Sequence, residues 1–332
     1  MYNSFYGLKA SPFRLNPDPS FMCMTEQHQE ALAGLIHSVC TRPGLTVLVG
    51  EAGTGKTTLL YTLLEMLERR RYIAALCTNP TLTRAEFYDL LMLKFGVDCA
   101  SGLKSRQLVA LEEKLRRNRS DGRPSVLLLD EAQRLPLDLL EEIRLLLNLE
   151  TPREKLLDII IAGQPELGEI LGRPDLRQLK QRVSCVCKLQ PLNLQELHDY
   201  IKHRLAQAGL PNQSLFSDNL MDRIHRYTAG IPRLVNSLCD NALLIGFALE
   251  APAITPAILE EAAADLDLTS GQILLEDLLD VPESPAPLAR FARQGQNGTS
   301  AMSTVNPSVP LDSYAARQKS LGFFSSLMDR WK

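Results

Sequence analysis

Residues 45–57 read Leu-Thr-Val-Leu-Val-Gly-Glu-Ala-Gly-Thr-Gly-Lys-Thr, and this stretch decides the fold that we expect. An apolar strand runs into a turn that matches the pattern G-x-x-x-x-G-K-[ST], and a helix is predicted to follow from about Lys56 to Arg70. Glycines let successive backbone N–H groups curl around phosphate oxygens, and the positive end of the helix dipole faces the same point. A Gly-rich turn without a ligand is the alternative, and the flanking strand and helix disfavour it. The predicted phosphate-binding residues are Gly50, Glu51, Ala52, Gly53, Thr54, Gly55, Lys56, Thr57 and Thr58.

Two residues of this loop and two later acids carry the predicted chemistry. Lys56 is expected to contact the β- and γ-phosphates, and the Thr57 hydroxyl is expected to bind Mg²⁺. The apolar run 126–129 ends in Asp130 and Glu131, so both acids should lie where open α/β sheets bind ligands, at a strand's carboxyl end. Asp130 would orient the Mg²⁺ shell, and Glu131 would polarise the attacking water as general base. The pair favours hydrolysis; two ordinary strand-end acids are the alternative.

Composition excludes several other classes of protein. The chain has 332 residues, a formal net charge of −3, 45% hydrophobic and 23% charged residues, which excludes a fully disordered or fibrous chain. No apolar run approaches the roughly 18–20 residues that cross a bilayer, and the N-terminus does not have the pattern of a secretory signal. Seven scattered cysteines indicate reduced thiols, and five dispersed histidines disfavour a zinc site. We therefore expect a cytoplasmic protein.

The order of predicted elements divides the chain into four parts. Strands separated by helices in residues 1–190 predict a three-layer α/β core with a mostly parallel sheet, in which alternating residues 183–189 form an outer strand. Residues 191–268 predict a small all-helical lid. Residues 269–319 are rich in Pro, Gly and Ser, which predicts a flexible linker. Residues 320–332 predict an amphipathic C-terminal segment, since apolar side chains share one helical face there: Leu321, Phe324, Leu327, Met328 and Trp331.

Several motifs together resemble known families. The combination resembles the AAA+ ATPases, through residues 50–57, 129–131, Ala162-Gly-Gln-Pro-Glu-Leu167 and Gly230-Ile-Pro-Arg-Leu-Val-Asn236. More narrowly, the opening is similar to secretion ATPases of the general secretion pathway protein A (ExeA/GspA) family, through Phe5-Tyr-Gly-Leu8, Pro12-Phe13, Asn16-Pro-Asp-Pro19 and His28-x-x-Ala31-Leu32. The resemblance covers about residues 1–268. It implies a P-loop NTPase fold, ATP with Mg²⁺, and a homo-oligomer; no guanine motif of the Asn-Lys-x-Asp type is present.

The resemblance also implies roles for four residues outside the loop. Gln164 would be the first sensor, which contacts the γ-phosphate or the attacking water. Arg182 sits where AAA+ proteins present an arginine finger in trans to a neighbouring subunit of a ring, and Arg177 competes for that role. Arg233 would be the second sensor on the lid, fixed in the first turn of a helix. The alternatives are a loop glutamine and solvated surface arginines.

Each of two features near the N-terminus has two interpretations. The aromatic and proline-rich segment either lines the adenine pocket, as the family's position suggests, or caps another part of the core. His28 is either a ligand or, as we favour, a structural histidine of its helix.

The family implies an ATP-driven motor or switch that supports assembly of an envelope system: secretion, pilus or exopolysaccharide export. Relatives often continue into a transmembrane helix and a periplasmic region that binds peptidoglycan, and we expect neither from this sequence. We therefore expect a relay through a partner protein of the envelope complex, or peripheral contact with the inner membrane through residues 320–332. The alternative is a DNA-associated ATPase of the transposition-regulator (TnsC/TniB) type, indicated by the basic runs 69–71 and 116–119. A slowly hydrolysing, nucleotide-gated scaffold is a third class.

Overall fold

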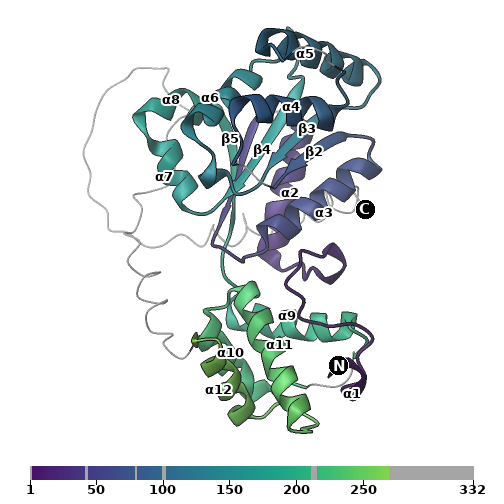
Figure 1. Ribbon diagram of the computed structural model, residues 1–332, viewed down its shortest axis with the longest axis vertical. Coiled ribbons are helices and arrows are strands. Elements are labelled where there is room, and N and C mark those ends of the chain that lie inside the picture. The colour runs from purple at the N-terminus through teal and green to yellow at the C-terminus, as the bar shows by residue number, and fades with distance from the viewer. Residues whose placement is uncertain (1, 42–43, 79–80, 99–101, 211–214, 269–332) are drawn as a thin grey trace, which may run out of the picture.

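The computed structural model describes residues 2–41, 44–78, 81–98, 102–210 and 215–268. A sheet with helices on both faces stands above a bundle of helices in Figure 1. The predicted linker at 269–319 and the predicted amphipathic segment at 320–332 lie outside the described residues.

The sheet has five strands, and every neighbouring pair is parallel. The strands are β1 (Leu45–Gly50), β2 (Ile73–Cys77), β3 (Ser125–Leu129), β4 (Leu157–Gly163) and β5 (Val183–Leu189). Their order in space is β2-β3-β4-β1-β5, so β1 lies between β4 and the outer strand β5. The strand at 183–189 was predicted to be an outer strand, and this is confirmed, because β5 is at one end of the order.

Helices cover both faces of this sheet and make the three layers that were predicted. They are α2 (Glu26–Thr41), α3 (Lys56–Arg69), α4 (Arg84–Phe95), α5 (Lys104–Ser120), α6 (Leu137–Leu146), α7 (Glu166–Gly172) and α8 (Arg177–Lys180). Alternate residues of buried β3 point to opposite layers. Val126 and Leu128 pack in a cluster with α2 and α3. Leu127 and Leu129 pack in the cluster that contains residues of α4 to α8.

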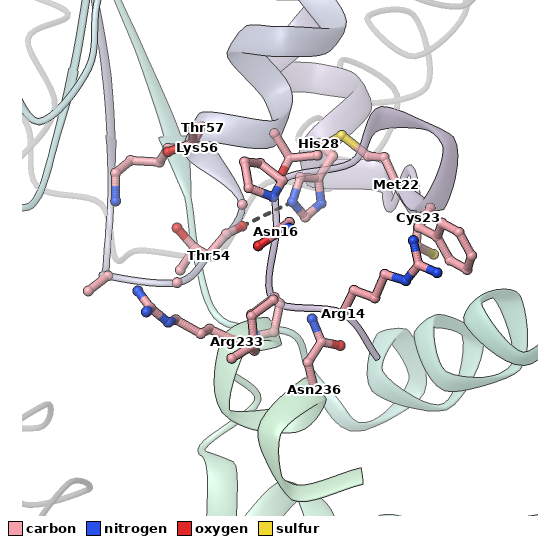
Figure 2. Close-up of a pocket in the computed structure, with 18 of the residues that line it drawn as sticks. Arg14, Asn16, Met22, Cys23, His28, Thr54, Lys56, Thr57, Arg233 and Asn236 are labelled. Carbon is pink, nitrogen blue, oxygen red and sulfur yellow. Dashed lines mark hydrogen bonds between the residues drawn. The ribbon is translucent and has the colours of Figure 1, made fainter. Parts of the chain in front are cut away.

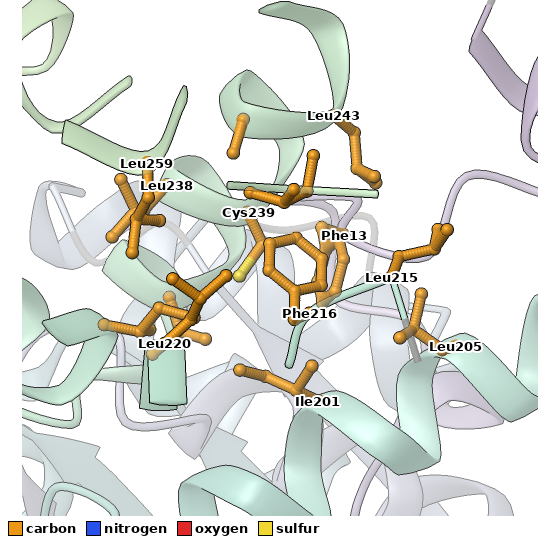
Figure 3. Close-up of a cluster of buried hydrophobic side chains, with 14 of the residues drawn as sticks. Phe13, Ile201, Leu205, Leu215, Phe216, Leu220, Leu238, Cys239, Leu243 and Leu259 are labelled. Atoms are coloured by element: carbon orange, nitrogen blue, oxygen red, sulfur yellow. The ribbon is translucent and has the colours of Figure 1, made fainter. Parts of the chain in front are cut away.

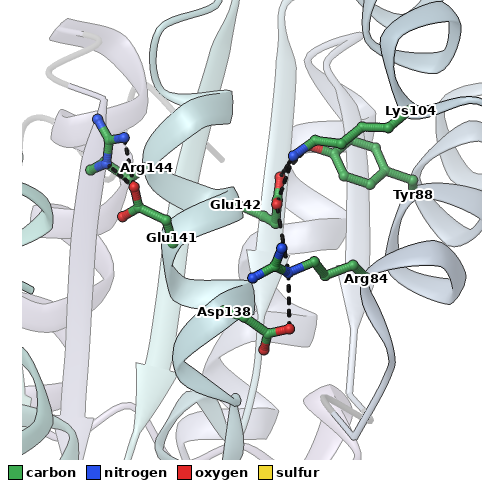
Figure 4. A network of polar contacts seen from close by, with 7 residues as sticks. All are labelled: Arg84, Tyr88, Lys104, Asp138, Glu141, Glu142 and Arg144. Atoms are coloured by element: carbon green, nitrogen blue, oxygen red, sulfur yellow. Dashed lines mark hydrogen bonds and ion pairs between the residues drawn. The ribbon is translucent and has the colours of Figure 1, made fainter.

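A buried carboxylate joins three helices of the second layer (Figure 4). Glu142 of α6 is 2% exposed. It accepts a 2.7 Å hydrogen bond from the Tyr88 hydroxyl of α4, and the Lys104 ammonium of α5 lies 2.7 Å from its carboxylate. Burial raises the pKa of Tyr88, which keeps this hydroxyl a donor. A buried charge is tolerated because it is paired and hydrogen-bonded on two sides.

The helices after the sheet form the predicted all-helical part. They are α9 (Leu194–Gln207), α10 (Asp218–Thr228), α11 (Pro232–Ala248) and α12 (Pro256–Asp265). A capping box between Asn193 and Glu196 starts α9, as the sequence pattern predicts. Figure 3 shows the centre of this cluster, where Phe13 and Phe216 meet edge to face with their ring centroids 5.8 Å apart.

The start of the chain packs into this helical cluster. The short helix α1 (Tyr2–Phe5) lies against α11, and Tyr2, Tyr6 and Phe13 are buried among residues of α9 to α12. The chain therefore reaches the sheet only after crossing from the helical part, and the crossing segment runs beside the site described below (Figure 1).

Candidate functional site

The loop between β1 and α3 has the backbone conformation that a phosphate cradle requires. Gly53 and Gly55 have φ angles of 84° and 97°, a region that residues with a Cβ rarely adopt. A Cβ on Gly50 would lie 2.7 Å from the Leu189 carbonyl oxygen. Helix α3 begins directly after this loop, at Lys56, so its N-terminal N–H groups face the loop.

Lys56 lies inside this loop. Its side chain is 5% exposed, and its Nζ donates to the carbonyl oxygens of Gly50 at 2.7 Å and Glu51 at 2.9 Å. Burial lowers the pKa of Lys56, while the acids nearby act in the opposite direction. A phosphate would supply this ammonium with a charged partner in place of two neutral carbonyls.

Asp130 and the Thr57 hydroxyl meet at the ends of β3 and the loop, and the hydroxyl donates to Asp130 Oδ2 at 2.5 Å. Burial raises the pKa of Asp130, which is 2% exposed. Mg²⁺ takes oxygen ligands and is usually held by one or two carboxylates, waters and substrate phosphates. This pair of oxygen donors fits that ion. The described residues hold no cluster of three or more His, Cys, Asp or Glu side chains suited to a metal.

Glu131 and Gln164 are joined by a residue that the sequence analysis missed. The Gln133 amide donates to Glu131 Oε2 at 2.7 Å, and Gln133 Oε1 accepts from the Gln164 N–H at 3.1 Å. Glu131 has a left-handed φ of 53°, so the chain turns sharply here and returns Gln133 toward β4. Sequence alone could have singled out this glutamine only by its place two residues after the acid pair.

Arg233 is in the first turn of α11, as predicted, and the structure brings it to the loop. Its backbone N–H donates to the Gly53 carbonyl at 3.2 Å, and its side chain lines the cavity next to the loop. Arg177 and Arg182 lie elsewhere: neither lines this cavity, and the Arg182 guanidinium donates to Asn148 Oδ1 at 2.8 Å. The structure of one chain brings neither of these arginines to its own loop.

The cavity has a volume of about 580 Å³ and lies between the loop, the helical part and the N-terminal segment (Figure 2). The N-terminal segment lines this cavity with some of its residues and packs in the helical cluster with others. Residues 14–17 and 21–23 line the cavity, whereas Tyr2, Tyr6 and Phe13 pack in the helical cluster. The remaining lining comes from His28, the loop residues 52–58, Glu131, Arg134, Gln164, Tyr200, Arg204, Pro232, Arg233 and Asn236.

His28 supports the loop from behind. Its Nδ1 lies 2.7 Å from the Thr25 hydroxyl and its Nε2 lies 3.2 Å from the Thr54 carbonyl oxygen. Burial lowers the pKa of His28, so the neutral ring is favoured; it accepts from Thr25 and donates to Thr54. These contacts agree with the structural role that we favoured.

Sheet order and loop placement put the chain among the P-loop NTPases of the AAA+ class, so the fold predicted from sequence is confirmed. A family profile described as "AAA domain" matches residues 37–171. Two similar solved structures agree in fold: Cdc6p from Pyrobaculum aerophilum (TM-score 0.58, 19% identity, 84% of this chain and 74% of that one) and the RuvB Holliday junction branch migration motor of Thermotoga maritima (TM-score 0.52, 16% identity, 77% and 76%).

Among curated proteins, the chain is 41% identical over 250 residues to general secretion pathway protein A of Aeromonas hydrophila. The match covers 75% of this chain and 45% of that relative, so the chain spans less than half of the relative's length. The predicted resemblance to the general secretion pathway protein A family is confirmed, and the fold implies nucleotide binding.

Proposed function

We propose that the chain is an ATPase that uses Mg²⁺. The observation that carries this proposal is the meeting of Thr57 and Asp130 at 2.5 Å beside the buried Lys56 ammonium. The oxygens of Thr57 and Asp130, which would bind a divalent cation, then lie at the same backbone loop as the Lys56 ammonium, which would contact the phosphates. Bound Mg²⁺ would neutralise charge on the β- and γ-phosphates.

Each predicted residue then has a role in hydrolysis. Glu131 takes a proton from the attacking water, and Gln164 positions that water or the γ-phosphate. Arg233 senses the γ-phosphate from the lid. An arginine finger, Arg182 or Arg177, reaches the site of a neighbouring copy and stabilises charge in the transition state, so the active form is a homo-oligomer.

We propose that this ATPase supports assembly of an envelope system: secretion, pilus or exopolysaccharide export. Support comes from its identity with general secretion pathway protein A. We divide it into a core at residues 1–190, the first residues of which pack on the lid, a lid at 191–268, a linker at 269–319 and a segment at 320–332 that contacts a partner protein or the cytoplasmic face of the inner membrane. None of the helices in the described ranges combines the length and the apolar character needed to cross a bilayer.

The DNA-associated alternative depends on the two basic runs. In the described structure, three of these arginines have a glutamate partner one turn earlier, since Arg69, Arg116 and Arg117 pair with Glu65, Glu112 and Glu113. Such i, i+4 pairs and the helix dipole account for these arginines without a nucleic acid. We therefore favour the envelope role. Salt-sensitive binding of duplex DNA would reverse this preference.

Measurements of nucleotide binding and of phosphate release test the proposed ATPase activity. Lys56→Ala should weaken ATP binding by at least about tenfold, because hydrogen bonds to charged groups are worth roughly 1.5–3 kcal/mol. Lys94→Ala, at an exposed position of α4, is the matched control. Unchanged affinity in Lys56→Ala would refute the phosphate-loop assignment.

The proposed arginine finger, which acts on the site of a neighbouring copy, is tested separately. Specific activity should rise with protein concentration, and Arg182→Ala or Arg177→Ala should lower it by up to about 10³-fold without changing nucleotide affinity in the monomer. Flat specific activity, with both variants behaving as wild type, would contradict the oligomeric site.

A further inference from the structure

Three buried polar side chains form the floor of the cavity on the side of the helical part. Tyr200 and Arg204 come from α9 and Asn236 comes from α11, and they are 6%, 8% and 5% exposed. None of them belongs to the phosphate loop or to the predicted catalytic set. Polar groups this deeply buried need partners, so the direction of each hydrogen bond can be worked out.

Arg204 is the fixed end of this group. Its Nη1 donates to the carbonyl oxygens of Pro12 at 2.8 Å and Arg14 at 3.4 Å, which ties α9 to the N-terminal segment. Its guanidinium lies over the rings of Phe21 and Tyr200, with 5.6 and 5.2 Å from its central carbon to the ring centroids. A guanidinium has donors only. Any hydrogen bond between Arg204 and another side chain therefore ends on an acceptor.

Tyr200 is held from one side by this guanidinium, which packs on its ring. The Tyr200 hydroxyl then donates its own proton to Asn236 Oδ1 at 2.9 Å. Burial raises the pKa of Tyr200, so the phenol keeps this proton at neutral pH. The hydrogen bond between these two side chains therefore runs in one direction, from the phenol to the amide carbonyl.

One hydrogen-bond donor of Asn236 is not used in its contact with Tyr200. The Asn236 carbonyl is engaged by Tyr200, so the amide group presents its NH₂, and this NH₂ makes no hydrogen bond within the described part of the chain. Figure 2 shows the Asn236 nitrogen on the side that faces the cavity. Asn236 lies one helical turn beyond Arg233, whose N–H contacts the loop at Gly53. The free donor and the loop thus line one cavity.

Given the nucleotide site proposed above, we infer that Asn236 is the residue that selects the base, by donating to N1 of adenine. N1 is the ring nitrogen on the edge furthest from the sugar, and it accepts a hydrogen bond in adenine. In guanine and hypoxanthine the same nitrogen carries a proton, so two donors would face each other. A site built to hydrogen-bond one group discriminates against an analogue that leaves its buried polar atom unpaired. Tyr200 and Arg204 are positioning residues, since they act through the amide.

Equilibrium binding to the full chain, measured by calorimetry without hydrolysis, tests this inference. Wild type should bind ATP at least about tenfold more tightly than GTP or inosine triphosphate, the cost of one unmade hydrogen bond to a buried donor. A 7-deaza analogue of ATP, which retains N1, should bind like ATP. Asn236→Asp replaces the donor by an acceptor and should narrow or invert the preference between ATP and GTP. Ser237→Ala, at the next position of α11, is the matched control.

Tyr200→Phe keeps the ring and removes only the hydroxyl that orients the amide. It should reduce the preference for ATP over GTP while ATP binding is retained, and it carries the test if Asn236→Asp does not fold. Equal binding of ATP and GTP by wild type, weak binding of the 7-deaza analogue, or an unchanged ATP-to-GTP ratio in a folded variant would each overturn the assignment to N1. If wild type bound no nucleotide at all, both this assignment and the proposed function would be overturned, which distinguishes the two failures.

Discussion

The two ends of the cavity are built in different ways. The proposed phosphate end is a continuous stretch of backbone, residues 50–57. Two glycines at positive φ give this loop its curvature, and one buried lysine lies inside it. The other end, where we propose that the base binds, is assembled from the N-terminal segment, α9 and α11, and the Arg204 guanidinium there donates to the Pro12 carbonyl 192 residues earlier in the chain. A cradle of main-chain groups suits any triphosphate, whereas side-chain donors and acceptors can tell one base from another. The comparison predicts that variants at the phosphate end change ATP affinity or turnover, and that variants at the proposed base end change selectivity and the attachment of the lid.

The largest effect is expected at the acid pair. Glu131→Gln removes the proposed general base but keeps the shape of the side chain, so kcat for ATP hydrolysis should fall by about 10²–10⁴ while ATP affinity stays within threefold or so. Glu169→Gln, at an exposed position of α7, is the control for loss of a carboxylate. If Glu131→Gln turned over ATP at the wild-type rate, hydrolysis would have to use another group.

The next effect is on stability, at the base end. Arg204→Met keeps much of the apolar stem and removes the hydrogen bonds to Pro12 and Arg14, so we expect the free energy of unfolding to fall by about 2–3 kcal/mol. Urea unfolding measures this, and exposed Arg226→Met of α10 is the control. A wild-type unfolding curve would mean that the N-terminal segment is held by its aromatic residues alone.

A smaller effect is expected for the residue that joins Glu131 to Gln164. Gln133→Ala should lower kcat by about tenfold with little change in KM, because the base is then no longer oriented. Gln178→Ala on α8 is the control. Equal losses in kcat and in affinity would indicate general disruption of the loop instead.

The smallest effect concerns pH and His28. Burial lowers the pKa of His28 in the folded state below its ordinary value of 6.5, so the unfolded chain binds more protons as the pH falls through that value. Stability should therefore be full above about pH 6.5 and decline below it. His28→Gln should reduce this dependence, and exposed His37→Gln should leave it unchanged, in thermal melts from pH 5 to 8. The same slope in all three proteins would assign it to other groups.

Much of the core could be predicted because its signals are local. The continuous apolar run at Val126–Leu129 predicts a strand that is buried on both faces, and the structure buries all of β3. The capping box at Asn193 and Glu196 marks the start of α9 within four residues of sequence. Roles for Gln164, Arg177, Arg182 and Arg233 came from resemblance and remain predictions.

The phosphate loop could be assigned from the amino-acid sequence, because glycine spacing and a strand-to-helix transition act over about ten residues of backbone. The sequence did not determine the floor of the cavity. Tyr200 and Arg204 are ordinary polar positions of a helix in the sequence, and Asn236 has no partner nearby along the chain. Only the tertiary structure decided that the three meet and in which direction their protons point, because buried donors and acceptors must be matched across segments that the fold brings together.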